Sequence, residues 1–262
     1  MLKFSNANAK TEALKEVDEL KPFLLDRKIY SLDLLSGYSC PFASECLSKA
    51  TVIDGKRKIK DGPNTKFRCF SASQEVQYTG VYNSRQNNMD ILELAAQSYM
   101  DAADILESSL PPKATCVRIH VGGDFKTQAY FDAWLEVAKR NPNILFYAYT
   151  KSLPFWVARL GALEFITNFV LTASRGGWRD DLIEKHDLRE AVVVFSEEEA
   201  DRLGLEIDHD DSHAADPNWR NLNFALLIHG SQPAGSKASK ALQQLKKKGW
   251  TGYGKEKGRV KV

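Results

Sequence analysis

The sequence predicts an α/β protein whose six parallel strands form a partial (β/α)6 TIM-like barrel. Short apolar runs alternate with longer segments of helical periodicity along the 262 residues, which is the pattern of repeated βαβ units. The runs are almost continuously apolar, as are the strands of a parallel sheet covered on both faces. No feature of the chain marks a reversal of strand order, so a doubly wound sheet is the alternative rather than the first choice.

The individual elements follow from the same pattern. Strands are predicted where apolar runs end in small, polar or charged residues, at residues 29–35, 115–121, 144–149, 168–172, 191–195 and 223–228. Helices are predicted where apolar residues recur with a helical period, at residues 87–110, 127–140, 154–163, 178–186, 197–203 and 236–247. Pro111 and Pro112 end the first of these helices, and Ser196 is placed to cap the fifth.

Composition divides the chain into three parts. Residues 1–27 are predicted as an N-terminal helical extension with a helix at 11–20, because Leu14, Val17 and Leu20 recur on one face. Residues 28–248 form the partial barrel, which includes a cysteine-rich loop at residues 36–70. Residues 249–262 form a basic C-terminal tail.

The overall composition is that of an ordinary soluble protein, with 43% hydrophobic and 27% charged residues. The first residues are polar and do not resemble a secretory signal. No apolar run approaches the roughly 20 residues that are needed to span a bilayer. We therefore expect no membrane association and a cytoplasmic location, where thiols stay reduced.

Charge is distributed unevenly around a net value of +2. Four of the five residues from Lys56 to Lys60 are basic, and the segment from Lys246 to Lys261 is also rich in lysine. The tail has Trp250 interleaved with its lysines, so nucleic acid is a candidate partner. The alternative is a solvated terminus, which is the usual state of a block of like charges.

Three of the four cysteines lie in polar loop sequence. Five residues separate Cys40 from Cys46, and twenty-two separate Cys46 from Cys69. Cysteine is usually buried, so this placement favours a metal centre, and we expect a [4Fe–4S] cluster with three thiolate ligands. A zinc site completed by a histidine and thiols without metal are the alternatives. Cys116 begins its strand at the opposite end of the barrel and is expected to be a core residue.

The carboxyl ends of the other strands supply further candidate site residues, because ligands of parallel barrels bind at this rim. They are Gly122, Gly123, Asp124, Lys151, Ser174, Arg175 and His229. The glycines allow close approach of a ligand, and the charged groups suit carboxylates, phosphates or amines. The alternatives are a plain turn in which Asp124 caps the next helix, and ordinary surface charges. His120 is expected to be a core histidine.

The polar segment 208–213 is expected to be a solvated loop, with a divalent metal site as the alternative.

The cysteine segments resemble those of a known phage family. Residues 36–46 follow the pattern Ser-Gly-x-Ser-Cys-Pro-x-Ala-x-x-Cys, Cys69 lies within Arg-Cys-Phe-Ser-Ala, and His229 begins His-Gly-Ser-Gln-Pro-Ala-Gly. These segments are similar to the phage "gene product 88" family over residues 28–235. The resemblance implies a viral origin.

The chain is also loosely similar to radical S-adenosylmethionine enzymes. Those enzymes combine a partial barrel of six βα units with a three-cysteine [4Fe–4S] site after the first strand and a Gly-Gly-acid motif after the second. The resemblance implies that Cys40, Cys46 and Cys69 hold a cluster whose open iron faces S-adenosylmethionine, with Gly122 to Asp124 beside it. The departure is the third cysteine, which in those enzymes lies in the same compact loop as the other two.

The leading hypothesis is therefore a phage-encoded iron–sulfur protein, a radical or redox enzyme that binds a small-molecule ligand at the open iron. The rival hypothesis is a structural or nucleic-acid-associated phage protein in which a zinc ion braces the cysteine loop.

Overall fold

The computed structural model describes residues 1–18, 20–24, 28–95, 98–219, 221–250 and 252. Its centre is an eight-stranded sheet in the order β1-β2-β5-β6-β7-β8-β10-β9. The strands are β1 (Phe4–Asn6), β2 (Lys28–Leu32), β5 (Ala114–Ile119), β6 (Leu145–Thr150), β7 (Phe169–Ser174), β8 (Glu190–Val194), β9 (Glu206–Ile207) and β10 (Phe224–Leu227).

The prediction of a mostly parallel α/β sheet is confirmed. Strands β2, β5, β6, β7, β8 and β10 correspond to the six predicted runs, and each pairs in parallel with the next one along the chain. The sheet ends in two free edges, β1 and β9, and is not closed, so a TIM-like barrel is not confirmed. The two edge strands were not predicted, because they have three and two residues and carry no apolar run.

Helices cover one face of the sheet. They are α4 (Thr79–Ala95), α5 (Tyr99–Ser108), α6 (Gln128–Arg140), α7 (Leu153–Val157), α8 (Leu160–Leu163), α9 (Asp181–Lys185), α10 (Glu197–Leu203) and α12 (Lys237–Lys247). The largest apolar core lies between these helices and strands β2 to β7, and includes Phe131, Trp134 and Phe146.

Two predicted helices on this face are wrong in their extent. The helix expected at 87–110 is instead α4 and α5, because Ser98 caps the start of a new helix by accepting a hydrogen bond from the Asp101 amide at 3.3 Å. Residues 96 and 97 lie outside the described part of the chain. The helix expected at 154–163 is likewise two short helices, α7 and α8. Ser196 caps α10 as predicted.

The N-terminal segment and α11 (Ser212–Ala215) cover the other face. The predicted helix at 11–20 is wrong, since the chain forms α1 (Ala9–Glu12), a 3-10 turn η1 (Ala13–Glu16) and α2 (Lys21–Leu24). A second 3-10 turn, η2 (Pro217–Trp219), follows α11. Leu14, Leu20 and Leu24 pack against this face of the sheet, in the same core as Cys116. The described residues of the N-terminal segment therefore share an apolar core with the sheet.

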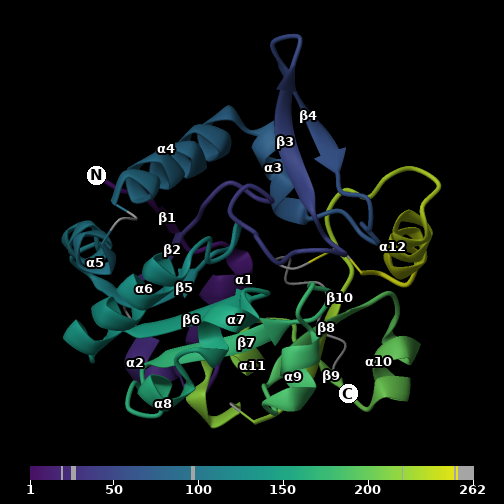
Figure 1. Cartoon of the computed structure of the whole chain (residues 1–262). Helices are drawn as coiled ribbons and strands as arrows, with labels where there is room; N and C mark the ends of the chain where they lie inside the picture. Colours follow the sequence, from purple (N-terminus) through teal and green to yellow (C-terminus); the bar gives the residue numbers. More distant parts are fainter. Residues whose placement is uncertain (19, 25–27, 96–97, 220, 251, 253–262) are drawn as a thin grey trace.

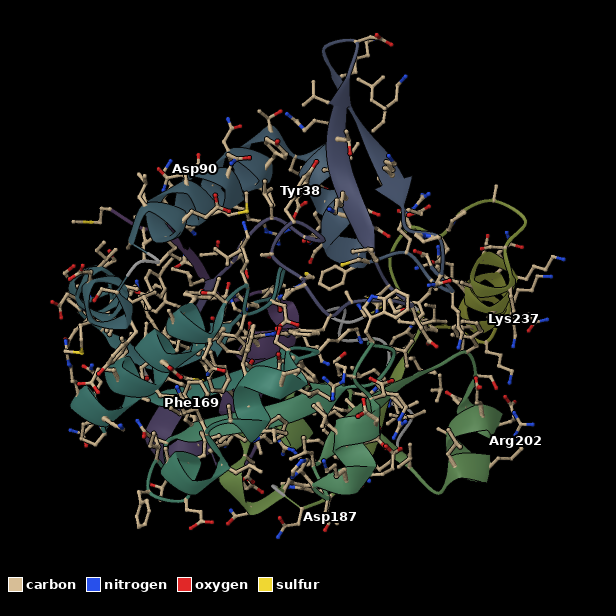
Figure 2. The ribbon with its side chains drawn as sticks, in the orientation of Figure 1. Tyr38, Asp90, Phe169, Asp187, Arg202 and Lys237 are labelled. Atoms are coloured by element: carbon tan, nitrogen blue, oxygen red, sulfur yellow. The ribbon has the colours of Figure 1, made fainter. Side chains whose placement is uncertain are left out.

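A β-hairpin, β3 (Ser48–Ile53) and β4 (Lys56–Asp61), projects from the body of the molecule and is the second sheet (Figure 1). The helix α3 (Phe70–Gln77) packs against its base, and Tyr38 lies beside it (Figure 2). The hairpin was not predicted, because its charged residues hide the strand pattern. The sequence did contain one signal of the hairpin, the dipeptide Asp54-Gly55, because Asp-Gly is typical of a two-residue hairpin turn. In the structure these two residues form the turn, with φ values of 51° and 70°.

No helix in the described ranges is long and apolar enough to cross a membrane.

Candidate metal centre and ligand cavity

A cavity of about 450 Å³ lies at the carboxyl ends of the parallel strands. It is the size of a small-molecule site. Cys40, Cys46 and Cys69 all line it, and so do five of the predicted rim residues: Gly123, Asp124, Lys151, Ser174 and His229. The strand-end rule thus selected residues that share one cavity, although Gly122 and Arg175 are not among the lining residues.

The three cysteines of the cavity are half-buried free thiols. Cys116 is instead fully buried, in the core between the sheet and the N-terminal segment. Burial raises the pKa of the Cys40 thiol, and the charges of Asp124 and Cys69 raise it further. Burial also raises the pKa of Cys46, to about 11, while the positive charge of Lys151 acts in the opposite direction. The amide of Gly37 donates a hydrogen bond to Cys40 Sγ at 3.3 Å, as amides do to metal-bound thiolates.

The hairpin explains the wide gap between Cys46 and Cys69. Its two strands run out and back, and Ser48 at the start of β3 pairs with Asp61 at the end of β4. The chain then returns to the cysteine loop, where the Lys66 amide donates to the Glu45 carbonyl at 2.7 Å. Most of the twenty-two intervening residues therefore form the hairpin, and Cys69 lines the same cavity as the first two cysteines.

The late His-Gly-Ser-Gln segment holds the third cysteine in place. The Gln232 side chain accepts a hydrogen bond from the Arg68 amide at 2.7 Å and donates one to the Arg68 carbonyl at 3.1 Å. The Phe70 ring packs on the His229 imidazole, with centroids 4.9 Å apart. A Cβ atom on Gly230 would lie 2.6 Å from the Phe70 Cβ, so glycine is required there. This contact joins the end of the last strand to the cysteine segment.

The Gly122-Gly123 pair after β5 packs closely against the cysteine loop and its supporting residues. A Cβ on Gly122 would lie 2.7 Å from the Arg85 guanidinium carbon, and one on Gly123 would lie 2.6 Å from Ser39 Oγ. Gly123 also has a φ of +92°. The Ser39 hydroxyl accepts a hydrogen bond from the Asp124 amide at 3.3 Å, so the residue before Cys40 is packed directly on this turn. The glycines thus let the cysteine loop approach the end of β5.

Replacing Gly123 with alanine is expected to destabilise the protein by about 2–3 kcal/mol, because the positive φ and the clash with Ser39 both oppose a Cβ. Gly161 is the matched control. A Cβ atom on Gly161 would meet nothing within 4 Å and its φ is not positive, so Gly161→Ala is expected to be neutral or to stabilise α8 by up to about 1 kcal/mol. Urea unfolding of both variants measures the difference, and equal stability would contradict the packing role of Gly123.

Asp124 is fixed between two strand ends. Its carboxylate accepts hydrogen bonds from the Thr150 hydroxyl at 2.6 Å, the Lys151 amide at 2.8 Å and the Phe125 amide at 2.7 Å. Burial raises the pKa of Asp124 to about 6 in spite of these donors. The cap of α6 is Thr127, whose hydroxyl accepts from the Tyr130 amide, so the capping role considered for Asp124 is wrong.

Lys151 and Arg175 have different surroundings although both follow strand ends. The Lys151 ammonium is buried and donates to the carbonyls of Ser174 and Arg175, each at 2.6 Å, and to Ser174 Oγ at 2.9 Å. The Arg175 guanidinium is instead paired with Glu184 and Glu190. Lys151 therefore places its charge at the cavity, whereas the charge of Arg175 is used in surface ion pairs.

The two histidines near the cavity are also distinct. His120 has a φ of +67°, and its Nε2 lies 3.0 Å from the Tyr130 hydroxyl of α6. It is buried as expected, but it also lines the cavity, so it is not only a core histidine. Burial lowers its pKa to about 3. His229 lies at the cavity, with Nδ1 3.1 Å from the Leu227 carbonyl, and burial lowers its pKa to about 4. Both rings are therefore neutral at pH 7.

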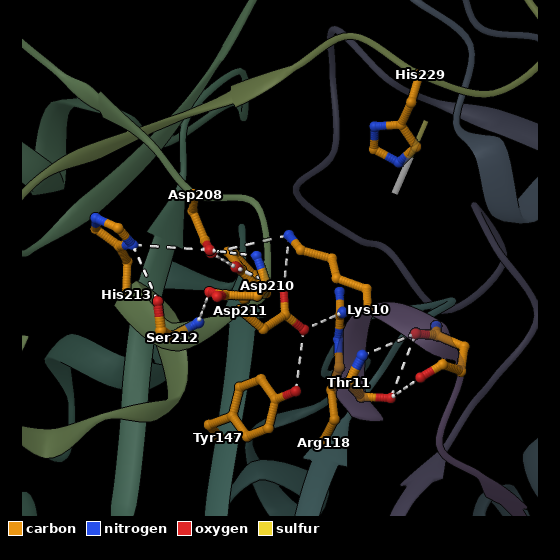
Figure 3. A network of polar contacts seen from close by, with 12 residues as sticks. Lys10, Thr11, Arg118, Tyr147, Asp208, Asp210, Asp211, Ser212, His213 and His229 are labelled. Atoms are coloured by element: carbon orange, nitrogen blue, oxygen red, sulfur yellow. Dashed lines mark hydrogen bonds and ion pairs between the residues drawn. The ribbon is translucent and has the colours of Figure 1, made fainter. Parts of the chain in front are cut away.

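A buried ionic network whose cations, Lys10 and Arg118, line the cavity was not predicted (Figure 3). Asp211 is fully buried; it forms an ion pair with Lys10 at 2.8 Å and with Arg118, and accepts from the Tyr147 hydroxyl at 3.0 Å. Asp208 is also fully buried, 3.8 Å from Lys10 Nζ. The expectation of a solvated loop at 208–213 is wrong, because cations from α1 and β5 neutralise its carboxylates inside the fold.

A second buried network supports the start of the cysteine loop. Glu75 Oε1 accepts hydrogen bonds from the Ser36 amide at 3.0 Å, the Ser36 hydroxyl at 2.8 Å and Arg85 Nη1 at 2.9 Å. Asp33 lies 3.6 Å from Arg85 and accepts from the Gly122 amide at 3.2 Å. No local pattern in the sequence signals this network, because Glu75 and Arg85 lie in different helices, α3 and α4.

Among the residues that the structure describes, no group of three or more His, Cys, Asp or Glu side chains lies close enough together to hold a single metal ion. The cysteines line a shared cavity without converging on one point.

Comparison with known proteins gives one result. A family model described as Gene product 88 matches residues 1–247, which is nearly the whole chain. No curated protein and no solved structure matches the chain. The similarity seen in the cysteine and His-Gly-Ser-Gln segments is thus confirmed over the full fold, and the chain belongs to the Gene product 88 family.

Proposed function

We propose that the chain is an iron–sulfur protein in which Cys40, Cys46 and Cys69 hold a [4Fe–4S] cluster at the strand ends. The supporting observation is that three half-buried cysteines, brought together by the hairpin, line one cavity. Cys116, the remaining cysteine, lies in a different core. A [4Fe–4S] cluster is wider than a single ion and binds each thiolate at a separate iron, so its ligands need not converge on one point.

The rest of the cavity suits a small molecule beside the cluster. Three thiolate ligands would leave one iron of the cluster open to a ligand, and the cluster, when reduced, would supply one electron. Lys151 contributes a fixed positive charge that offsets the negative charge of the thiolates. Asp124, held by three donors, and His229, neutral at pH 7, are the polar groups that would orient the ligand. S-adenosylmethionine is the first candidate for this ligand. Gly123 and Asp124 follow β5, the second of the parallel strands, which is where radical S-adenosylmethionine enzymes have their Gly-Gly-acid motif. Such a cluster suits a reducing cytoplasm, which for a phage protein is the cytoplasm of the host cell.

Anaerobic reconstitution with iron and sulfide tests the cluster. The wild-type protein is expected to become brown and to hold about four iron and four sulfide per chain. Replacing any one of Cys40, Cys46 or Cys69 with alanine is expected to remove most of this content. Cys116→Ala is the matched control and is expected to keep the wild-type content, since its thiol is fully buried elsewhere. Colourless protein containing one zinc ion, or equal loss in the Cys116 variant, would overturn the proposal.

The ligand is tested separately on the reconstituted protein. Titration of the reduced cluster with S-adenosylmethionine is expected to change its electron paramagnetic resonance spectrum. An unchanged spectrum would exclude binding of this molecule at the iron and leave the cluster itself supported by the iron and sulfide content.

A further inference from the structure

The projecting hairpin carries a row of lysines on one of its two faces. Paired residues of an antiparallel ribbon share a face, and Lys49 pairs with Lys60, Thr51 with Lys58, and Ile53 with Lys56. These pairs place Lys49, Lys56, Lys58 and Lys60 together, and we call this the lysine face. The other face carries Ser48, Ala50, Val52, Arg57, Ile59 and Asp61.

The lysine face points to solvent. The opposite face is the one that packs on the body of the protein, since Ser48 and Ala50 are buried and both strands contact α3. Lys56, Lys58 and Lys60 are exposed. The face contains no acidic side chain; Asp54 lies in the turn, and Asp61 is on the other face, where it pairs with Arg68 at 2.5 Å. The positive charge of the lysine face is therefore not neutralised within the hairpin.

We propose that the lysine face binds the phosphate backbone of duplex DNA. Unneutralised lysines that alternate along a strand lie about 7 Å apart and can contact successive phosphates of one backbone. A two-stranded ribbon is narrow enough to enter the major groove. None of the six paired residues of this face is aromatic, and the single Tyr38 ring beside it is already in contact with the Lys49 ammonium. The face therefore offers a row of charges rather than a row of rings on which unpaired bases could stack, which favours a duplex over a single strand.

The lysine face adjoins the candidate metal centre. The ammonium of Lys49 lies 4.7 Å from the centre of the Tyr38 ring, and the Tyr38 hydroxyl lies 3.4 Å from the Ala50 carbonyl. Tyr38 is two residues before Cys40, and β3 begins two residues after Cys46. A duplex on this face therefore lies next to the cysteine loop. The inference does not depend on the cluster, because the hairpin register is set by backbone pairing.

The test is binding of a mixed-sequence 30-base-pair duplex, followed by fluorescence anisotropy at several sodium chloride concentrations. The hairpin variant replaces Lys56, Lys58 and Lys60 with glutamine. Loss of three phosphate contacts is expected to reduce the slope of log K against log salt by about 2.7, and the affinity at 0.1 M salt on the order of a hundredfold. Replacement of the same residues with arginine is expected to retain binding.

The control variant replaces Lys113, Lys139 and Lys185, which lie outside both basic segments of the chain, with glutamine. These lysines are also exposed, so the control has the same change in net charge, and a slope close to that of the wild type is expected. Measuring both variants with and without reconstituted iron separates DNA binding from cluster loading.

Three results would overturn the proposal: an unchanged slope in the hairpin variant, an equal loss in the control variant, or displacement of the duplex by poly-glutamate at equal affinity. The last result would identify a surface for acidic polypeptides instead. Thermal unfolding of each variant confirms that the fold is retained.

Discussion

Replacing Asp211 with asparagine is expected to lower the free energy of unfolding by about 3–5 kcal/mol at pH 7. Asp211 is fully buried and paired with Lys10 and Arg118, so the change leaves two cations partly uncompensated in the interior. Asparagine keeps the side-chain shape and tolerates the φ of 64° at this position, which isolates the effect of the charge. Urea unfolding of the wild type and the variant measures the difference.

Asp187→Asn is the matched control. Asp187 also has a positive φ, of 48°, but it is exposed, so the same substitution is expected to change stability by less than about 0.5 kcal/mol. Equal effects at the two positions would contradict the role of the buried network in holding α1 against the sheet.

The same network gives a pH dependence with a definite sign. Burial alone would raise the pKa of Asp211, but Arg118 and Lys10 lower it below its usual range. A carboxylate of this kind stabilises the fold above its unfolded pKa of about 3.9, and that contribution is lost as the pH falls through the lower folded pKa. Wild-type stability is therefore expected to fall below about pH 4, and the Asp211→Asn variant to show a smaller loss. A variant with an equal or larger acid loss would contradict this assignment.

The main sheet could be predicted because buried parallel strands leave a simple signal. Residues 168–172 and 191–195 are continuous apolar runs that end in small polar residues, and both are strands in the structure. The rule that ligands bind at the carboxyl ends of parallel strands then placed Asp124, Lys151 and His229 at one cavity. In each case the information is local, or comes from a general property of parallel sheets.

The features that were missed depend on partners distant in sequence. Asp211 is buried only because Lys10 and Arg118, 201 and 93 residues away, neutralise it. The hairpin was hidden because its solvent face is lysine rather than an ordinary polar mixture. For the same reason the position of Cys69 could only be read as a departure from the compact three-cysteine loop of the radical S-adenosylmethionine enzymes. Once β3 and β4 are paired, the separation in sequence no longer implies a separation in space.

Replacing Arg85 with alanine is expected to destabilise the protein by about 3–5 kcal/mol, because it leaves the buried carboxylates of Asp33 and Glu75 without their cation. The effect should extend to the cysteine loop. Glu75 holds the Ser36 amide and hydroxyl, Asp33 holds the Gly122 amide, and Arg85 joins the two carboxylates. Hydrogen exchange at the Ser36 amide is therefore expected to accelerate along with the loss of global stability in urea.

Two controls separate this role from a general loss of charge. Arg179→Ala removes an exposed arginine that pairs with Asp181, and is expected to change stability by no more than about 1 kcal/mol. Arg85→Lys keeps the positive charge but not the forked donor, so an intermediate loss is expected. If Ser36 exchange stayed slow in Arg85→Ala, the network would not be what positions the loop. If it accelerates, the buried ion pairs are what hold the start of the cysteine loop, because Glu75 binds Ser36 four residues before Cys40.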